Sequence, residues 1–195
     1  MPYSAEHKQE TWTKIVESAR ILFNRHGFQD VTIDMVMEKA GLTRGGFYNH
    51  FSSKELLYEA AVSSFLMGRG AAWRKDAGVD PTSPASEMAH QLIRGYLSAD
   101  HLGDLDGQCP MIALPSDVAR ANPQVQSAYQ MLLDAMVGLV ENGLTQKSKE
   151  AREQALSVAA LCVGGMVLAR TLPDSKLANE VRQAAQKSAL SMAKA

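Results

Sequence analysis

The sequence has few cysteines and no recognisable secretory leader. Cys109 and Cys162 are the only cysteines among its 195 residues, which excludes a disulfide-stabilised framework. The N-terminus shows no charged stretch followed by an apolar one, the pattern of a signal peptide. The most apolar run, residues 155–169, is shorter than a membrane span and is flanked by charged residues. These absences predict a cytoplasmic protein.

The net charge is also small. The 20 Lys and Arg residues nearly balance the 21 Asp and Glu residues, which gives a formal net charge of −1. This balance excludes a protein that coats nucleic acid non-specifically, because counterion release requires many cations on one surface. It is compatible with a site-specific reader whose few cations lie in one element. Aromatic residues make up only 6% against 46% hydrophobic residues, which favours a helical core with aliphatic packing.

Residues 32–51 predict two short helices joined by a tight turn. Thr32 is suited to cap the first helix, because the apolar residues that follow it have i, i+3, i+4, i+7 spacing. Gly41 ends this helix, and Thr43 is placed to cap the second one. Only a sharp turn fits between them, which is the geometry of a helix-turn-helix.

Two adjacent glycines, Gly45 and Gly46, lie within the second helix. Each is expected to cost about 1 kcal/mol relative to alanine. A helix that accepts this loss is expected to bring its backbone close to another molecule. Beyond it, Ser52 and Glu55 have capping-box spacing, which predicts that a further helix begins at residue 52.

All charged side chains between residues 39 and 54 are cationic: Lys39, Arg44 and Lys54. Polar residues that suit phosphate oxygens and base edges are interleaved with them. We therefore predict a DNA-binding surface. The alternative is an ordinary helical hairpin with a solvated basic face.

The segments T-I-D-M-V, A-G-L-T, G-G-F-Y-N-H-F and S-K-E-L-L resemble the DNA-binding domain of the tetracycline-repressor (TetR) family, over about a quarter of the chain. The resemblance implies an all-α fold. A three-helix helix-turn-helix head would be joined by a fourth helix to a helical ligand-binding and dimerisation domain. We place the head at residues 1–55 and the second domain at residues 56–195.

The family motif also implies roles for individual residues of the head. Arg44 and Asn49 are expected to read base edges. Gly46 faces the groove and permits close approach without hydrogen-bond readout, so specificity also depends on DNA shape. The residues expected to hold phosphates are Thr32, Thr43, Tyr48, His50 and Lys54.

The remaining pattern is helical. A first helix with apolar periodicity over residues 12–23 is expected to stop at Gly27, while residues 1–7 show no pattern and are expected to fray or form an arm. The fourth helix is expected to run unbroken from residue 52 to about residue 74, so that it links the two domains rigidly. The acidic stretch 100–107 fails the pattern of a calcium-binding loop, and we predict a surface loop and no metal.

The segment around Cys109 is a candidate for the switch. Pro110 suits the first turn of a helix, which places Cys109 at its N-terminus, where the helix dipole can lower the pKa of the thiol. The alternative is that Cys109 only packs at a cavity wall. Pro115 interrupts the helix one turn later and leaves space for a ligand. This segment also resembles, over a short stretch, one group of TetR-family ligand domains.

Three long helices follow, at residues 122–143, 148–172 and 175–193. In the TetR family the last two helices of two subunits form a four-helix bundle, so the resemblance implies a homodimer. The alternative is that they pack only within one chain. The predicted pocket residues are mostly apolar or aromatic, which implies a small hydrophobic effector: Trp73, Tyr96, Cys109, Met111, Tyr129, Leu133, Met136 and Met166.

These features predict a one-component transcription regulator, in the simplest case a repressor that a small hydrophobic effector releases from a palindromic double-stranded DNA operator. No cofactor, metal or catalytic residue is predicted. One alternative is a redox or electrophile sensor in the same scaffold that acts through Cys109. Others are a helical interaction protein without DNA binding, and a cysteine-dependent enzyme that pairs Cys109 with His90 or His101, for which no oxyanion loop is recognisable.

Overall fold

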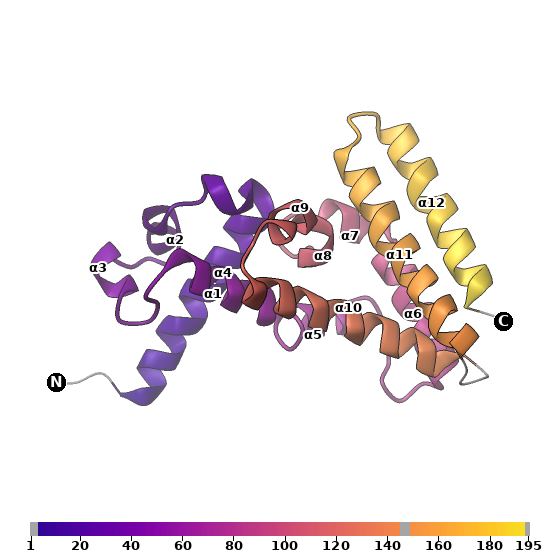
Figure 1. Cartoon of the computed structure of the whole chain (residues 1–195), viewed down its shortest axis with the longest axis horizontal. Helices are drawn as coiled ribbons and strands as arrows, with labels where there is room; N and C mark the ends of the chain where they lie inside the picture. Colours follow the sequence, from indigo (N-terminus) through magenta and orange to yellow (C-terminus); the bar gives the residue numbers. More distant parts are fainter. Residues whose placement is uncertain (1–3, 145–148, 194–195) are drawn as a thin grey trace.

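The computed structural model describes residues 4–144 and 149–193, and every regular element in this part of the chain is a helix (Figure 1). The head and the α11–α12 pair lie at opposite ends of the molecule. The all-α prediction is confirmed. The helices are α1 (Ala5–Asp30), α2 (Ile33–Lys39), α3 (Arg44–Phe47), α4 (Lys54–Ser63), α5 (Arg69–Asp76), α6 (Ala85–Tyr96), α7 (Ala99–Gly103), α8 (Pro110–Ala113), α9 (Pro115–Ala119), α10 (Pro123–Gly143), α11 (Lys149–Thr171) and α12 (Ser175–Met192).

Local capping explains where the helices of the head begin. The Oγ1 of Thr32 accepts a hydrogen bond from the backbone N–H of Met35 at 3.2 Å, as its predicted capping role requires. Ser4 caps α1 in the same way, so the expectation of an unstructured segment is wrong for residues 4–7. Gly27 interrupts α1 with a φ of 77°, and the turn after α2 uses Gly41 with a φ of 71°.

The second helix of the helix-turn-helix is shorter than predicted. α3 ends at Phe47, and the chain continues to His50 through i→i+3 hydrogen bonds. The Thr43 side chain makes no capping hydrogen bond, and two glycines weaken the helix, so little favours its extension. The cap of α4 is Ser53, whose Oγ accepts from Leu56 N–H at 3.2 Å, and the predicted cap at Ser52 is wrong by one residue.

The predicted unbroken fourth helix is also wrong. α4 ends at Ser63, a turn follows, and α5 begins only after Gly68. The turn is tight, because a Cβ added at Gly68 would lie 2.8 Å from the carbonyl oxygen of Ser64. A Cβ at Gly70 would lie 2.7 Å from the carbonyl oxygen of Phe65. These two glycines therefore allow the tight turn between α4 and α5.

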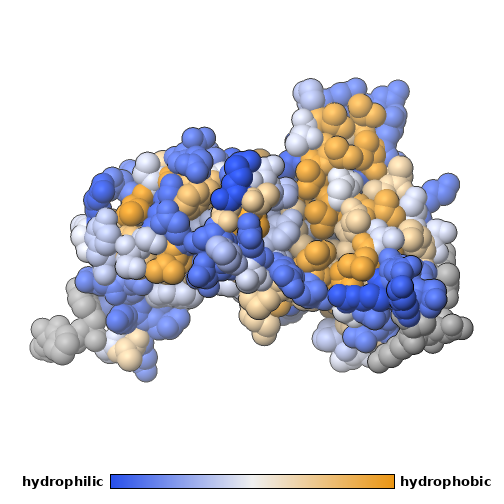
Figure 2. Space-filling view, viewed as in Figure 1, coloured by the Kyte–Doolittle hydropathy of each residue, from blue (hydrophilic) through white to orange (hydrophobic). Residues whose placement is uncertain are grey.

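The second domain is organised around α10, which packs against α4, α6 and α11, while α11 packs along α12. Small residues allow this last approach, as predicted, since a Cβ at Gly165 would lie 2.6 Å from the Cβ of Ala185. The predicted start of α11 at residue 148 lies outside the described residues. By length and composition alone α11 could cross a membrane, but one of its faces is buried within this fold. Apolar side chains also gather on its outer surface (Figure 2).

Candidate functional site

The head presents a polar surface around α3. A groove between α3 and the first two turns of α1 brings together four of the predicted DNA-binding residues, namely Thr43, Gly46, Asn49 and His50. Thr32, Arg44 and Tyr48 are exposed outside this groove, and Tyr48 retains 58% of its surface. One side of the groove is formed by α1 through His7, Lys8 and Thr11, and the sequence pattern did not predict this contribution.

Arg44 is paired within the head. Its guanidinium lies 2.5 Å from a carboxylate oxygen of Asp34, and both side chains are more than half exposed. An exposed ion pair of this kind contributes only about 0–1 kcal/mol. Arg44 can therefore exchange Asp34 for a ligand at little cost. The pairing joins residues from two helices, and the sequence pattern gave no sign of it.

The fold of the head does not require glycine at either position of the Gly45–Gly46 pair. Among the described residues a positive φ occurs at Gly27, Gly41 and Gly78, and not in α3. A Cβ at Gly45 would meet nothing within 4 Å, while one at Gly46 would make an ordinary 3.6 Å contact with Met37. The bare backbone at Gly45 is therefore the point where another molecule could approach α3 most closely.

Lys54, which is predicted to hold a phosphate, also has a structural role within the head. Its Nζ donates hydrogen bonds to the carbonyl oxygens of Phe28 at 2.8 Å and Val31 at 3.0 Å. The ammonium also lies 4.2 Å from the centroid of the Phe28 ring. Two of its three donors thus satisfy carbonyl groups left free where α1 ends.

His50 contributes a neutral imidazole to the groove. Burial lowers its pKa from the ordinary value of 6.5, and the nearby Lys8 lowers the pKa further. At neutral pH the ring therefore carries no charge. It can donate one hydrogen bond to a phosphate oxygen, but it adds no cation to this surface.

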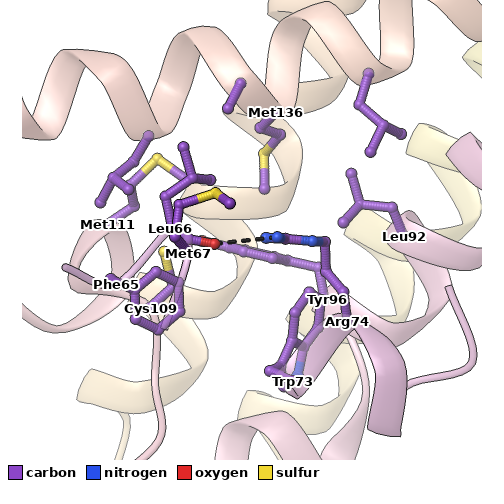
Figure 3. Close-up of a pocket in the computed structure, with 13 residues that line it drawn as sticks. Phe65, Leu66, Met67, Trp73, Arg74, Leu92, Tyr96, Cys109, Met111 and Met136 are labelled. Carbon is purple, nitrogen blue, oxygen red and sulfur yellow. Dashed lines mark hydrogen bonds between the residues drawn. The ribbon is translucent and has the colours of Figure 1, made fainter. Parts of the chain in front are cut away.

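A cavity of about 300 Å³ lies between the α4–α5 turn, α6, α8 and α10 (Figure 3). Five of the predicted pocket residues line it: Trp73, Tyr96, Cys109, Met111 and Met136. The sequence missed eight others, of which the first three lie in the unpredicted α4–α5 turn: Phe65, Leu66, Met67, Arg74, Leu92, Leu132, Ala135 and Leu139.

Three predicted pocket residues do not line this cavity. Tyr129 lies one turn before the lining part of α10, and its hydroxyl donates to the carbonyl oxygen of Met111 at 3.3 Å. Leu133 lies on a neighbouring stripe of the same helix. Met166 is fully buried in the core on α11. Helical periodicity identified the apolar faces but not the part of each face that borders the cavity.

The thiol of Cys109 is not activated. Although Cys109 precedes α8 as predicted, burial raises its pKa to about 11, and this effect outweighs the lowering by the backbone of Met111 and by Tyr96. The prediction of a lowered thiol pKa is therefore wrong, because a helix of four residues offsets little of the cost of burying a thiolate. The structure favours the alternative in which Cys109 packs at the cavity wall.

The contacts of the histidines do not form a nucleophile–base pair with Cys109. The Nδ1 of His101 lies 2.8 Å from the carbonyl oxygen of Tyr96, and its ring packs on Trp73. Within residues 4–144 and 149–193, no hydrogen bond joins the Cys109 thiol to His101 or His90. In the same residues no group of three His, Cys, Asp or Glu side chains could hold a metal ion.

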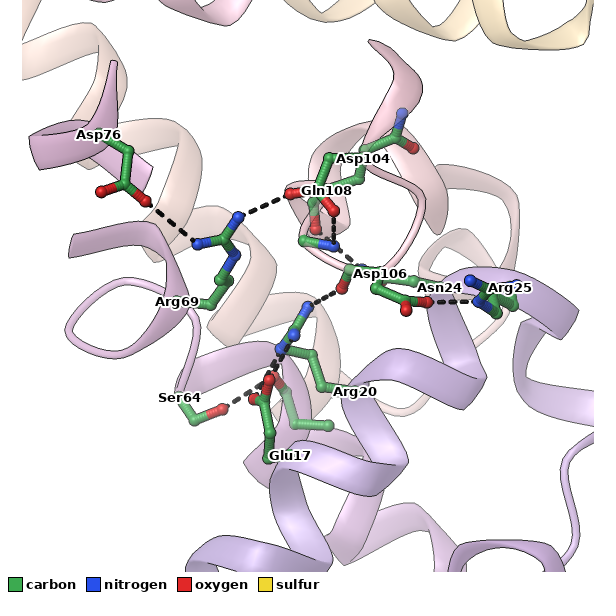
Figure 4. Close-up of polar contacts among 12 residues, drawn as sticks. Glu17, Arg20, Asn24, Arg25, Ser64, Arg69, Asp76, Asp104, Asp106 and Gln108 are labelled. Atoms are coloured by element: carbon green, nitrogen blue, oxygen red, sulfur yellow. Dashed lines mark hydrogen bonds and ion pairs between the residues drawn. The ribbon is translucent and has the colours of Figure 1, made fainter. Parts of the chain in front are cut away.

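A polar junction connects the cavity wall to the head (Figure 4). We use this name for the contacts that residues 106–108 make with α1 and α11. The Nη1 of Arg20 donates to the carbonyl oxygen of Asp106 at 2.5 Å, and Arg25 forms an ion pair with the Asp106 side chain. Asn24 Nδ2 donates to the carbonyl oxygen of Gln108 at 2.8 Å. The prediction of a surface loop over residues 100–107 is therefore wrong: α7 occupies its first part, His101 is buried, and Asp106 contacts α1.

Arg170 of α11 completes the polar junction. Its guanidinium donates to the side-chain oxygen of Gln108 and, at 2.5 Å, to the carbonyl oxygen of Asn24. Gln108 is fully buried and immediately precedes Cys109. A displacement of residues 106–108 would therefore change the hydrogen bonds that they make with α1 and α11.

Residues 15–61 match the family described as "Bacterial regulatory proteins, tetR family". The Transposon Tn10 TetC protein of Escherichia coli is 40% identical over 65 residues, which are 33% of this chain and 33% of that protein. The HTH-type transcriptional regulator TtgR of Pseudomonas putida is 32% identical over 91 residues, 47% of this chain and 43% of TtgR. The chain thus spans less than half of the length of these relatives.

Solved structures match over most of the chain. The crystal structure of the reduced form of E. coli NemR aligns with a TM-score of 0.75 at 17% identity. The alignment covers 92% of this chain and 95% of the NemR chain. A TetR transcriptional regulator from Chloroflexus aurantiacus aligns with a TM-score of 0.71 at 23% identity, covering 92% and 93%. The head sequence and the fold of the described chain agree: residues 15–61 form a DNA-binding head of the TetR family, and the described chain has the fold of solved TetR-family regulators.

Proposed function

We propose that this protein is a one-component transcription regulator, in the simplest case a repressor, that binds a palindromic operator as a homodimer in the cytoplasm. A ligand in the cavity would release it. The observation that carries the proposal is the exposed α3 surface, where a bare glycine backbone lies beside polar side chains on a TetR-family head.

On this proposal, the roles of the head residues follow from their surroundings. Arg44 and Asn49 are exposed, and both can reach base edges once Arg44 leaves its exposed ion pair with Asp34. The phosphate contacts are assigned to Thr32, Thr43, Tyr48 and His50, with His50 acting as a neutral donor. Lys54 holds the head together, and its remaining donor is the part available to a phosphate. Close approach of the DNA backbone is assigned to Gly45 together with Gly46.

The proposed dimer uses the outer surface of α11 and α12. Leu156, Leu168 and Leu177 are 43%, 56% and 44% exposed, although they lie on these otherwise well-packed helices. The apolar patch over α11 in Figure 2 has no cover within the described chain. Pairing of two such surfaces would set two recognition helices for half-sites about 34–36 Å apart, or a multiple of this distance.

The polar junction gives the proposed ligand response a structural route. A ligand contacts Cys109 and Met111, and the adjoining Gln108 is hydrogen-bonded to Asn24 of α1. A ligand that prefers one position of this segment therefore favours one orientation of the head. The coupling cannot exceed the difference between the ligand's affinities for the two states.

Gel-shift titrations with an operator obtained by selection test the proposed DNA surface. Arg44→Ala is expected to weaken specific binding by roughly 5–150-fold and to relax base preference, because a good contact to a base edge contributes about 1–3 kcal/mol. Arg94→Ala is the control, since Arg94 is an exposed arginine of α6. Unchanged affinity and unchanged preference in Arg44→Ala would overturn the assignment.

Gly45→Ala is expected to have opposite effects on the stability of the free protein and on its affinity for DNA. The helical backbone and the open space at Gly45 predict that alanine stabilises the free protein by about 0.5–1 kcal/mol. The same methyl group is expected to weaken DNA binding if the backbone meets the groove there. Stronger or equal DNA binding by Gly45→Ala would show that DNA does not approach α3 at this point.

A further inference from the structure

The cavity is apolar apart from a few polar groups. Of its thirteen lining residues, Arg74 alone carries a charge at neutral pH, and Asp and Glu are absent from the lining. Leucines, methionines and aromatic rings make up most of the remaining wall. A cavity with this composition suits a ligand that is mostly hydrocarbon and carries one polar group.

The guanidinium of Arg74 has hydrogen-bonding capacity to spare. Its Nη2 donates to the carbonyl oxygen of Leu66 at 3.0 Å, across the cavity (Figure 3). Among the described residues, no carboxylate lies within ion-pair distance of Arg74. Arg69, on the same helix, differs in this respect, because it pairs with Asp104 at 2.6 Å and with Asp76 at 3.6 Å. Arg74 is thus a half-buried cation whose counter-charge must come from solvent or from a ligand.

Tyr96 supplies a second polar group without a partner. The side chain lines the cavity and is only 2% exposed, and its hydroxyl has no hydrogen-bond partner in the described structure. Its polar neighbour is the Cys109 thiol, which is only a weak hydrogen-bonding group, so the hydroxyl can exchange this contact for one to a ligand oxygen. Burial raises the pKa of Tyr96 well above 10, so the phenol stays protonated and can donate to an oxygen of a ligand.

We propose that the effector is a small organic acid whose carboxylate pairs with Arg74 and whose oxygens accept a hydrogen bond from Tyr96. A planar guanidinium can bind a carboxylate through two parallel hydrogen bonds, and such bonds are stronger in an apolar cavity than in water. The volume of about 300 Å³ lies at the small end of ligand sites. It fits a single aliphatic chain or one aromatic ring with a short tail. The inference deepens the proposed function, on which it rests, and adds an acidic group to the small hydrophobic effector expected from the sequence.

The proposal can be tested without any mutation by comparing ligands that share one hydrocarbon tail and differ only in their polar headgroup. Isothermal titration of the full chain at pH 7.5 would compare octanoate, octan-1-ol and octylamine, and likewise 4-phenylbutyrate and 4-phenylbutan-1-ol. We expect at least one acid to bind with a Kd tenfold or more below that of its alcohol, and octylamine to bind least. An alcohol that binds as tightly as its acid in both series, or failure of both acids to bind at millimolar concentration, overturns the proposal.

Variants then assign the preference to named groups. Arg74→Gln is expected to abolish the difference between acid and alcohol, and Arg74→Lys to restore part of it, because lysine keeps the charge but not the planar fork. Arg94→Gln, an exposed arginine on the helix that carries Tyr96, is the matched control. Tyr96→Phe is expected to weaken acid binding by about fivefold or more. A full acid preference in a folded Arg74→Gln protein overturns the proposal.

DNA binding is measured separately, so the two proposals can fail independently. Acid binding that follows the headgroup preference but leaves operator affinity unchanged supports the organic-acid site and contradicts the ligand response of the proposed function. Release of DNA by the alcohols alone supports a ligand response and contradicts the organic-acid site.

Discussion

Arg170 is the residue through which the polar junction can be tested most sharply. Its guanidinium donates to the fully buried Gln108 side chain and to the carbonyl oxygen of Asn24. Burial lowers the pKa of Arg170 from its ordinary value, as expected for a cation that is removed from water and has no carboxylate partner among the described residues. Arg170→Met retains an apolar stem of similar length but leaves both acceptors without these donors.

The expected loss follows from the number of bonds removed. Hydrogen bonds to a charged group contribute about 1.5–3 kcal/mol each, and relief of the arginine's own desolvation offsets part of that. We expect Arg170→Met to lower the free energy of unfolding by about 3 kcal/mol. For a chain of this size this corresponds to a fall in Tm of about 6–12 °C.

Arg152→Met is the matched control, because Arg152 lies on the same helix. Its side chain is 44% exposed and pairs with Asp134 at 3.5 Å and Glu141 at 3.1 Å, so we expect a loss of only about 0–1 kcal/mol. Urea unfolding followed by circular dichroism would be measured at one protomer concentration, since the proposed dimerisation would add to stability. Equal stability of the two variants would refute the account of the polar junction.

The same pair of variants tests coupling. If the polar junction carries the response, the ratio of operator Kd values with and without octanoate should move toward 1 in Arg170→Met and stay at the wild-type value in Arg152→Met. A wild-type ratio in Arg170→Met would mean that the signal reaches the head by another route.

Two further predictions follow from single side chains. Lys54→Met should lower the free energy of unfolding by about 1–3 kcal/mol, because the carbonyl oxygens of Phe28 and Val31 lose a charged donor. Lys39 lies on the exposed surface of α2, so the control Lys39→Met should change the free energy of unfolding by less than about 0.5 kcal/mol. Equal effects of the two variants in thermal unfolding would contradict the structural role of Lys54. Cys109, with its pKa raised to about 11, should react with iodoacetamide at pH 7.5 at least tenfold more slowly in the native than in the urea-unfolded protein. Equal labelling rates by mass spectrometry would instead favour a thiol sensor.

The sequence predicts those parts of the fold that depend on near neighbours. Thr32 and Asn122 cap the starts of helices, and Gly27 breaks α1 with a left-handed backbone; caps and left-handed glycines are local signals. Pro110 and Pro115 likewise begin short helices, because proline suits the first turn and lacks the N–H that a helix interior requires. Each of these predictions is confirmed.

The missed features depend on contacts between distant residues. Lys54 donates to a carbonyl group at the end of α1, and Arg44 of α3 pairs with Asp34 of α2. Neither partner can be identified before the helices are placed relative to one another. The break at Gly68 could have been suspected from Gly68 and Gly70, but its effect on the cavity depends on how Phe65 packs. Arg74 becomes a candidate ligand residue only through that break. The chemistry of the cavity was therefore beyond what periodicity could predict.

Selection of genomic DNA fragments by the full-length protein, followed by sequencing, tests the central claim most directly. The account predicts that a small set of fragments is enriched and shares an inverted repeat, and that Arg44→Ala loses this enrichment. Wild-type protein that retains no fragment above the level of Arg44→Ala would contradict it.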